Sequence, residues 1–285
     1  ITTLFRSKVR NVSYQAFVSE YRGHAGKLAA EICAMDDNDI CLVAVGGDGT
    51  ANEVINGITD FEKVRFGVIP TGSGNDLARG LSLSKDPKNG AIHILNAMKK
   101  SREDTWCMDL GEVNFGEKKR LFAISAGIGL DALVCKKALK STIKDILNKI
   151  RLGKLTYLVL TVQSLFTMQT ADAEIFFDRE EGLQKKRMIF TAAMNFKAEG
   201  GGVPMAPAAS ACDGKLSFCE AAGIPKWRTF LCLPFLVAAK HTSIHGFSVT
   251  DAKDCTIRLS RPMVVHADGE YCGEVTEVHF HCLPG

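Results

Sequence analysis

The chain has 285 residues, of which 46% are hydrophobic and 24% are charged, and its formal charge at pH 7 is +3. These proportions are typical of a globular protein with one large or two ordinary domains, and they exclude bulk disorder. The small net charge gives no reason to expect a nucleic acid partner.

The ten cysteines are scattered along the chain and several lie in apolar runs, which favours a reducing, cytoplasmic setting over a disulfide framework. The longest apolar run, residues 230–239, contains Pro234. It is shorter than the ~20 residues that a membrane-spanning helix needs. We therefore expect a cytoplasmic protein that meets a membrane, if at all, from the water side.

The first part of the chain alternates between two kinds of apolar pattern. Continuous runs typical of buried parallel strands occupy residues 40–45 and 64–69, and helical spacing occupies residues 28–33, 54–58, 77–81 and 91–98. Alternation of strand and helix predicts an open parallel sheet with helices on both faces.

Beyond Trp106 the pattern changes to short strand-like segments separated by Gly, Asp and Pro, which is typical of an antiparallel sandwich or barrel. These segments are residues 121–125, 173–177, 188–193, 215–219, 255–259 and 275–280, and a long helical stretch over residues 133–168 interrupts them. The predicted fold is therefore α/β plus β. It has an α/β nucleotide-binding domain over residues 1–106 and a β-rich domain over residues 107–285, whose last residues can return to the first domain.

A glycine-rich turn, Gly-Gly-Asp-Gly-Thr at residues 46–50, lies between the first predicted strand and a helix. Glycines let the backbone approach a phosphate closely, and the helix that follows presents free N–H groups. Asp48 falls at the carboxyl edge of the sheet, where open α/β folds bind ligands. For this pentapeptide alone, a tight turn with a capping aspartate is an equally good interpretation.

A second turn of the same kind, residues 70–76, follows the second predicted strand and again precedes a helix. Asn75 and Asp76 are candidates for the N-cap of that helix, a role that is compatible with facing a phosphate or a metal. Two glycine-rich turns with acidic residues at one edge of one sheet favour a shared site over two coincident caps.

With these turns the chain resembles the diacylglycerol kinase catalytic-domain family, which includes bacterial diacylglycerol kinases and related lipid, sphingosine and ceramide kinases. The turn at residues 46–50 is shared with NAD kinases, but its combination with residues 70–79 and with Asp268-Gly269-Glu270 is highly specific. Further matching segments are residues 22–25, 52–53, 109–111, 127–132, 206–207 and 213–216, together with Asn195 and residues 200–202.

The resemblance implies an NAD kinase/diacylglycerol kinase-like nucleotide domain and a β-sandwich lipid-substrate domain. It implies an enzyme that transfers the γ-phosphoryl group of ATP to the hydroxyl of a lipid such as diacylglycerol and requires Mg²⁺. We expect it to bind a membrane surface transiently from the cytoplasm. The sequence leaves the oligomeric state open, although related bacterial enzymes suggest a homodimer. By position, the nucleotide-binding residues are Ser19, Gly46, Gly47, Asp48, Gly49, Thr50, Gly72, Ser73, Gly74, Asn75 and Asp76.

The resemblance also assigns catalytic roles to carboxylates. Glu270 matches the family's general base, and Asp48 is the rival candidate for that base. Asp213 matches a structural Mg²⁺ ligand, and Asp48, Asp76, Asp109 and Asp213 match a network of aspartates around the metal. A lipid hydroxyl is a poor nucleophile, and a positioned carboxylate typically contributes ~10²–10⁴-fold by taking its proton.

Residues 1–6 depart from the family pattern, because they do not match its Asn-Pro-x-Ser/Ala-Gly loop. This departure supports one of the two alternative functions that stand beside the lipid kinase, the catalytically silent relative. The first is an NAD kinase, which shares the turn at residues 46–50, and the second is a catalytically silent lipid-binding relative.

Residues 134–156 combine seven lysines and arginines with an apolar stripe at helical spacing. This pattern suits either an anionic membrane surface or a solvated basic face. Residues 155–166 and 230–239 are candidates for an acyl pocket or for core. His241, His245, His279 and His281 lack the partners of a zinc site, and His266 is expected to orient the Asp-Gly-Glu turn rather than to transfer a proton.

Overall fold

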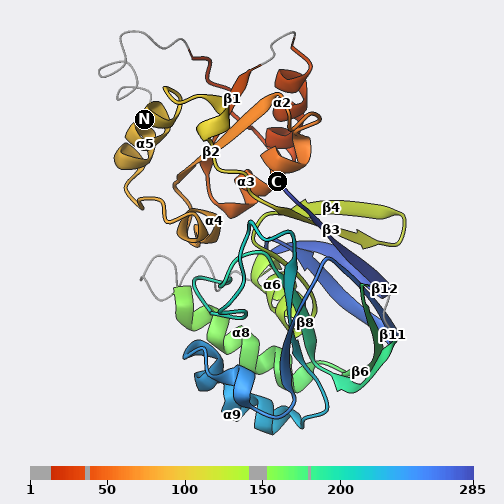
Figure 1. The fold of residues 1–285 in the computed structure, drawn as a ribbon. Helices are drawn as coiled ribbons and strands as arrows, with labels where there is room; N and C mark the ends of the chain where they lie inside the picture. Colours follow the sequence, from red (N-terminus) through yellow and green to blue (C-terminus); the bar gives the residue numbers. More distant parts are fainter. Residues whose placement is uncertain (1–13, 36–38, 141–152, 179–180) are drawn as a thin grey trace. The chain divides into compact units, whose positions relative to one another are not determined.

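The computed structural model describes residues 14–35, 39–140, 153–178 and 181–285, and the chain divides into two compact units, Ile1–Cys107 and Met108–Gly285 (Figure 1). All ten cysteines lie in the described residues and carry free thiols. No helix in this described part of the chain is both long and apolar enough to cross a bilayer.

The first unit is built on two parallel strands, β1 (Ile40–Gly46) and β2 (Val64–Pro70). Their register runs from Ile40 opposite Val64 to Gly46 opposite Pro70, so both strands end at the same level. The helices of this unit are α2 (His24–Cys33), α3 (Asp48–Gly57), α4 (Asp76–Gly80), α5 (Pro87–Ala97) and the short η1 (Arg102–Asp104).

Helices cover both faces of this strand pair. On one face Ala29 of α2 and Val54 of α3 pack with Ala44 of β1. On the other face Ile94 of α5 packs against Ile69 of β2. Figure 1 shows α3 and α5 on either side of the two strands. The predicted parallel sheet with helices on both faces is confirmed for the described strands.

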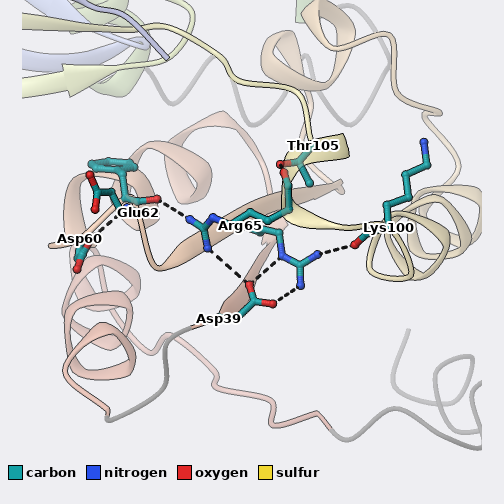
Figure 2. A network of polar contacts seen from close by, with 8 residues as sticks. Asp39, Asp60, Glu62, Arg65, Lys100 and Thr105 are labelled. Carbon is teal, nitrogen blue, oxygen red and sulfur yellow. Dashed lines mark hydrogen bonds and ion pairs between the residues drawn. The ribbon is translucent and has the colours of Figure 1, made fainter.

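A polar network lies at the opposite end of these strands from the glycine-rich turns (Figure 2). Arg65 donates from Nε and Nη2 to the Asp39 carboxylate, at 3.0 and 2.7 Å, and from Nη1 to the Lys100 carbonyl at 3.4 Å. Arg102 adds a bond to the Phe61 carbonyl at 3.1 Å. The network ties the segment after α5 to the start of the sheet, and its place at the amino ends of the strands gives it a structural role.

The second unit is a β-rich body with a continuous core. Its strands are β3 (Leu110–Phe115), β4 (Lys118–Phe122), β5 (Ser125–Gly129), β6 (Ala171–Phe177), β7 (Leu183–Met188), β8 (Phe190–Met194), β9 (Leu216–Ala221), β10 (Phe247–Ala252), β11 (Asp254–Ala267) and β12 (Glu270–Leu283). Its helices are α6 (Leu130–Lys140), α8 (Gly153–Thr167), α9 (Lys226–Val237) and the short η2 (His241–Ser243).

The described strands of this unit pair antiparallel in the order β10-β9-β8-β5-β11-β12-β3-β4, with β6 and β7 branching from β11. The long strand β11 pairs with β6 over Cys255–Leu259 and with β5 over Val265–Ala267, and its register with β12 shifts between Arg258 and Met263. One strand thus belongs to both layers, as in a sandwich whose corner is made by an irregular strand. The predicted sandwich is confirmed.

Several predicted element boundaries are wrong. The expected strand at residues 121–125 is broken, because the N–H groups of Ala123 and Ile124 donate to the Asp268 carboxylate, each at 2.8 Å, rather than to a neighbouring strand. The expected strand at residues 188–193 is split at Ile189 between β7 and β8. Of the expected long helix, the structure describes α6 and α8, and residues 141–152 lie outside the described part.

Two glycines set the close approach of α2 and α3. A Cβ on Gly57 would lie 2.1 Å from the carbonyl oxygen of Gly26, and a Cβ on Gly26 would lie 2.9 Å from that of Glu53. Because both neighbours are backbone atoms, the helices would have to separate to admit a side chain.

We predict that Gly57→Ala lowers the free energy of unfolding by about 1–3 kcal/mol, the usual cost of overpacking. Gly90→Ala in α5 is the matched control, since its Cβ would meet its nearest neighbours at 3.8 Å. Better helix propensity should leave that variant neutral or more stable by about 0.5–1 kcal/mol. Urea unfolding of the first unit measures both, and equal midpoints would contradict the close approach.

Candidate active site

The two glycine-rich turns of the first unit are in direct backbone contact. The N–H of Thr71 donates to the Gly46 carbonyl at 2.9 Å, and a Cβ on Gly72 would lie 2.5 Å from the Cα of Gly47. This contact follows from the register of β1 and β2, because strands that end at the same level deliver their turns to the same edge. The structure therefore brings together the turns that carry the predicted nucleotide-binding residues 46–50 and 72–76.

Asp48 links these turns. It is the first residue of α3, and its Oδ1 accepts the N–H of Leu77 at 3.1 Å. Asp48 thus supplies the capping side chain of α4, for which Asn75 and Asp76 are the candidates in the sequence. Asn75 occupies the N-cap position with φ 53°, but its Oδ1 and Nδ2 bond the N–H and carbonyl of Gly72 at 3.0 and 2.8 Å. Its side chain shapes the turn instead.

Two carboxylates flank Gly74. A Cβ at this glycine would lie 2.8 Å from Oδ2 of Asp48 and 3.7 Å from Oδ2 of Asp76. Asp76 also pairs with Arg79, which donates in addition to the Gly74 carbonyl at 3.0 Å. Small residues between two acidic side chains leave room for a cation, and carboxylate oxygens are the ligands that Mg²⁺ prefers.

The same edge suits an anion. α3 begins directly after Gly47, so the first N–H groups of this helix have no partner within it and point out of its positive end. Phosphate oxygens beside Asp48 and Asp76 would repel these carboxylates unless a divalent cation lay between them. The residues present therefore fit a polyphosphate together with a divalent metal ion. Ser19 lies apart from them in sequence, in the exposed segment before α2.

In the second unit, Asp109 and Asp213 meet at one loop. Asp109 is buried, and its carboxylate accepts the N–H groups of Gly214 and Gly285 at 2.7 and 2.8 Å. The exposed Asp213 accepts the N–H of Lys215 at 3.1 Å through one oxygen, Oδ1. Asp109 therefore orders the loop that presents Asp213, and Asp213 is the better candidate for a metal ligand.

Asn195 holds the Asp109 segment in place through hydrogen bonds. It is fully buried, and its Nδ2 donates to the carbonyls of Asp109 and Ala123 at 2.7 and 2.9 Å. A buried side chain that satisfies two carbonyls from distant segments fixes their relative position. Its role is to connect the Asp109 segment to the start of β5.

Glu270 follows a two-residue turn between β11 and β12. Asp268 and Gly269 have φ of 48° and 81°, the left-handed conformation of a tight hairpin, and Ala267 pairs with Glu270. The Asp268 carboxylate accepts three successive N–H groups, those of residues 123–125, at 2.8, 2.8 and 3.1 Å. The turn that carries Glu270 is thereby fastened to the segment before β5. The Asp-Gly pair signals the hairpin in the sequence, whereas nothing in the sequence signals these three bonds.

A cluster of two partly buried carboxylates and a buried histidine includes a residue of β11 next to this turn. Asp131, Glu199 and His266 have ligand atoms within 4.8 Å of one another. His266 Nε2 is 3.1 Å from Asp131 Oδ2, and its Nδ1 accepts the N–H of Gly269 at 3.2 Å. Since Nδ1 accepts, Nε2 of the neutral ring carries the proton and cannot bind a metal. The cluster is a hydrogen-bonded group, and sequence reasoning missed Asp131 and Glu199.

Two effects act in opposite directions on the pKa of His266. Burial of the ring disfavours the imidazolium, whereas the carboxylates of Asp131, Glu199 and Asp268 favour it and leave the pKa of His266 above its usual value. The balance is reversed at the buried His241. Burial lowers the pKa of this histidine more than its bond to the Met205 carbonyl raises it.

Both units match known proteins. Residues 3–108 match the family model described as "Diacylglycerol kinase catalytic domain", and residues 125–285 match the "YegS C-terminal NAD kinase beta sandwich-like domain". The protein named "Putative lipid kinase YtlR" of Bacillus subtilis strain 168 is 30% identical over 269 residues, which cover 93% of this chain and 85% of that protein. A diacylglycerol kinase of the same strain is 28% identical over 251 residues, which cover 86% of this chain and 75% of the relative.

Solved structures agree on the fold. A crystal structure from Bacillus anthracis strain Sterne, titled as a "putative diacylglycerol kinase", has a TM-score of 0.72 at 22% sequence identity and covers 93% of this chain and 82% of that one. The two family models and the relative of 30% identity confirm the resemblance inferred from the sequence. Matches to both domains along most of its length show that the chain belongs to the diacylglycerol kinase catalytic-domain family, with the C-terminal β-sandwich domain that accompanies it.

Proposed function

We propose that this protein is an ATP-dependent lipid kinase, which transfers the γ-phosphoryl group of ATP to the hydroxyl of a lipid such as diacylglycerol. The observation that carries the proposal is the direct contact of the two glycine-rich turns at the edge of β1 and β2, where helix N–H groups and two carboxylates meet. The names of the relatives supply the acceptor class, since several are diacylglycerol kinases.

In this proposal the first unit holds the nucleotide. The backbone of residues 46–50 and 72–75 surrounds the phosphates, and Asp48 and Asp76 hold Mg²⁺ beside them. The metal ion, when bound, neutralises charge that develops on the transferred phosphoryl group. Asp213 holds a second, structural Mg²⁺ in a loop that Asp109 keeps in shape.

Glu270 is the proposed general base, which removes the proton of the lipid hydroxyl. Asp48 is less suited to that role, because its Oδ1 already accepts the N–H of Leu77 and a protonated Asp48 would weaken this cap. Glu270 is the first residue of β12 and follows a turn that three hydrogen bonds, from backbone N–H groups to the Asp268 carboxylate, hold in place. A general base must keep a fixed position, and this turn provides one.

The proposed partner is a bilayer surface, approached through α9. Trp227, Leu231 and Phe235 recur at helical spacing on this helix and are 58, 57 and 49% exposed. They line a groove of about 250 Å³ together with Arg228. Large exposed apolar side chains beside a cation suit the boundary of an anionic membrane, where a tryptophan ring also prefers to lie. Of the basic stretch at residues 134–156, residues 141–152 lie outside the described part.

The first prediction of the proposed function concerns the reaction. Protein with MgATP and a panel of lipid alcohols in mixed micelles should transfer radiolabel from the γ-phosphate to at least one lipid. Glu270→Gln should lower kcat by about 10²–10⁴-fold, the usual contribution of a general base, and leave the affinity for ATP unchanged. Full activity of Glu270→Gln would refute its assignment.

Two further arms of that assay separate the alternatives. Formation of NADP from NAD, with no transfer to lipid, would identify an NAD kinase. Binding of MgATP without transfer to any lipid of the panel would identify a catalytically silent relative.

The second prediction concerns the nucleotide site. Gly72→Ala should abolish measurable ATP binding in calorimetry, because the new Cβ would lie 2.5 Å from the Gly47 backbone and force the turns apart. Gly90→Ala again serves as the control and should keep the wild-type affinity. An unchanged Kd in folded Gly72→Ala would show that the contact between the turns is not needed for binding.

The third prediction concerns the membrane. The triple variant Trp227→Ser, Leu231→Ser, Phe235→Ser should bind anionic vesicles more weakly than wild type and raise the KM for lipid at least several-fold, with unchanged affinity for ATP. Leu183→Ser in β7 is the matched control, since Leu183 is also a large exposed apolar residue of the second unit. Equal sedimentation of wild type and triple variant with vesicles would exclude this face.

A further inference from the structure

We propose that His266, held in one tautomer by Asp131, is a positioning residue that fixes the Asp268-Gly269 turn and through it the place of Glu270. The inference deepens the proposed function and rests on it, because positioning matters only if Glu270 acts on the acceptor. It is carried by two contacts that converge on one ring, those of a carboxylate and a backbone N–H, and by a glycine that leaves room for the carboxylate beside the ring.

The ring is built into the hairpin. His266 lies on β11, two residues before Asp268, and is 2% exposed. Its Nδ1 accepts the N–H of Gly269 at 3.2 Å, and Gly269 is bonded directly to Glu270 along the chain. The turn is therefore held at two points, at Asp268 by the backbone of residues 123–125 and at Gly269 by the imidazole.

Asp131 decides which ring nitrogen carries the proton. A carboxylate only accepts hydrogen bonds, so its contact with Nε2 at 3.1 Å requires Nε2–H and leaves the lone pair on Nδ1. That lone pair is what the Gly269 N–H needs. With an amide at position 131 the NH₂ group could face Nε2, the proton would move to Nδ1, and two donors would then oppose each other at Gly269.

Gly127 of β5 makes room for this arrangement. A Cβ at this position would lie 1.8 Å from Asp131 Oδ2 and 3.0 Å from His266 Nε2. A side chain there would displace the carboxylate from the ring. A glycine, an aspartate and a histidine from three different elements are thus mutually adapted, which a merely space-filling histidine would not require.

Protonation of His266 at acid pH should break its contact with the Gly269 N–H. The charged groups that face His266 are Asp131 from α6, Glu199 from the loop after β8 and Asp268 from the turn. Together they favour a second ring proton, which would occupy Nδ1 and displace the Gly269 N–H. The contact is therefore present above the pKa of His266 and lost as pH falls through it, which gives the activity an acid-side step.

The test compares two substitutions that each keep half of the ring's contacts. Asn carries its amide near the place of Nδ1 and Gln near that of Nε2. His266→Asn, which can still accept from Gly269, should keep kcat within about threefold of wild type and lose the acid-side step. His266→Gln, which keeps only the contact to Asp131, should lower kcat about tenfold or more, with the KM for ATP within twofold. Asp131→Asn should resemble His266→Gln.

A control variant and a spectroscopic readout complete the experiment. His241→Asn removes another buried histidine of the second unit and should lower Tm without changing kcat. Nitrogen chemical shifts of His266 in the wild-type protein should show the Nε2–H tautomer at alkaline pH. This readout does not depend on activity, so it tests the inference even if no lipid is phosphorylated and the proposed function fails.

Two results would overturn the inference. One is an Nδ1–H tautomer in the wild type. The other is a kcat for His266→Gln that equals that of His266→Asn when both are corrected for the folded fraction.

Discussion

The in-register pairing of β1 and β2 is the constraint on which the first unit depends. Because Gly46 and Pro70 lie opposite each other, the two turns leave the sheet side by side, and the Thr71 N–H can reach the Gly46 carbonyl. A slip of one strand by a residue would reverse the faces of its side chains and separate the turns by more than a van der Waals contact. The α2–α3 contact at Gly26 and Gly57 keeps α3, which begins with Asp48, close to that edge.

The second unit depends instead on hydrogen bonds from backbone N–H groups to aspartates. Aspartates there gather backbone N–H groups from distant segments: Asp109 joins Gly214 and Gly285, Asp268 holds residues 123–125, and Asp178 accepts from Lys253 and Asp254 at 2.9 Å. Hydrogen bonds to an ionised acceptor are stronger than neutral ones, and each removal would leave donors unsatisfied at about 1–3 kcal/mol. The loops that carry Asp213 and Glu270 owe their shape to these bonds more than to local turn chemistry.

The first unit depends on short-range patterns and the second on long-range hydrogen bonds, and this contrast explains which features could be predicted from the sequence. The strands at residues 40–45 and 64–69, and the turns that follow them, are signalled by contiguous apolar runs and glycines, and the structure extends each strand by a single residue, to Gly46 and Pro70. The break between β4 and β5 depends on a carboxylate more than 140 residues away, which no local pattern reports. Two further contacts come from distant segments in the same way. Asp48, rather than a residue of the turn before α4, caps α4, and Glu199 lies near His266 although it belongs to a separate loop.

The position of β12 has a consequence for how the chain acquires its structure. This last strand of the second unit lies between β11 and β3, and its end pairs Leu283 with Leu110 at the beginning of the unit. The hairpin of β3 and β4 is joined to the other strands through β12 in the order of the sheet. On a ribosome these early strands must wait for nearly the whole unit to be synthesised before they find their neighbour. Such long-range closure slows folding and leaves strand edges exposed to aggregation in the meantime.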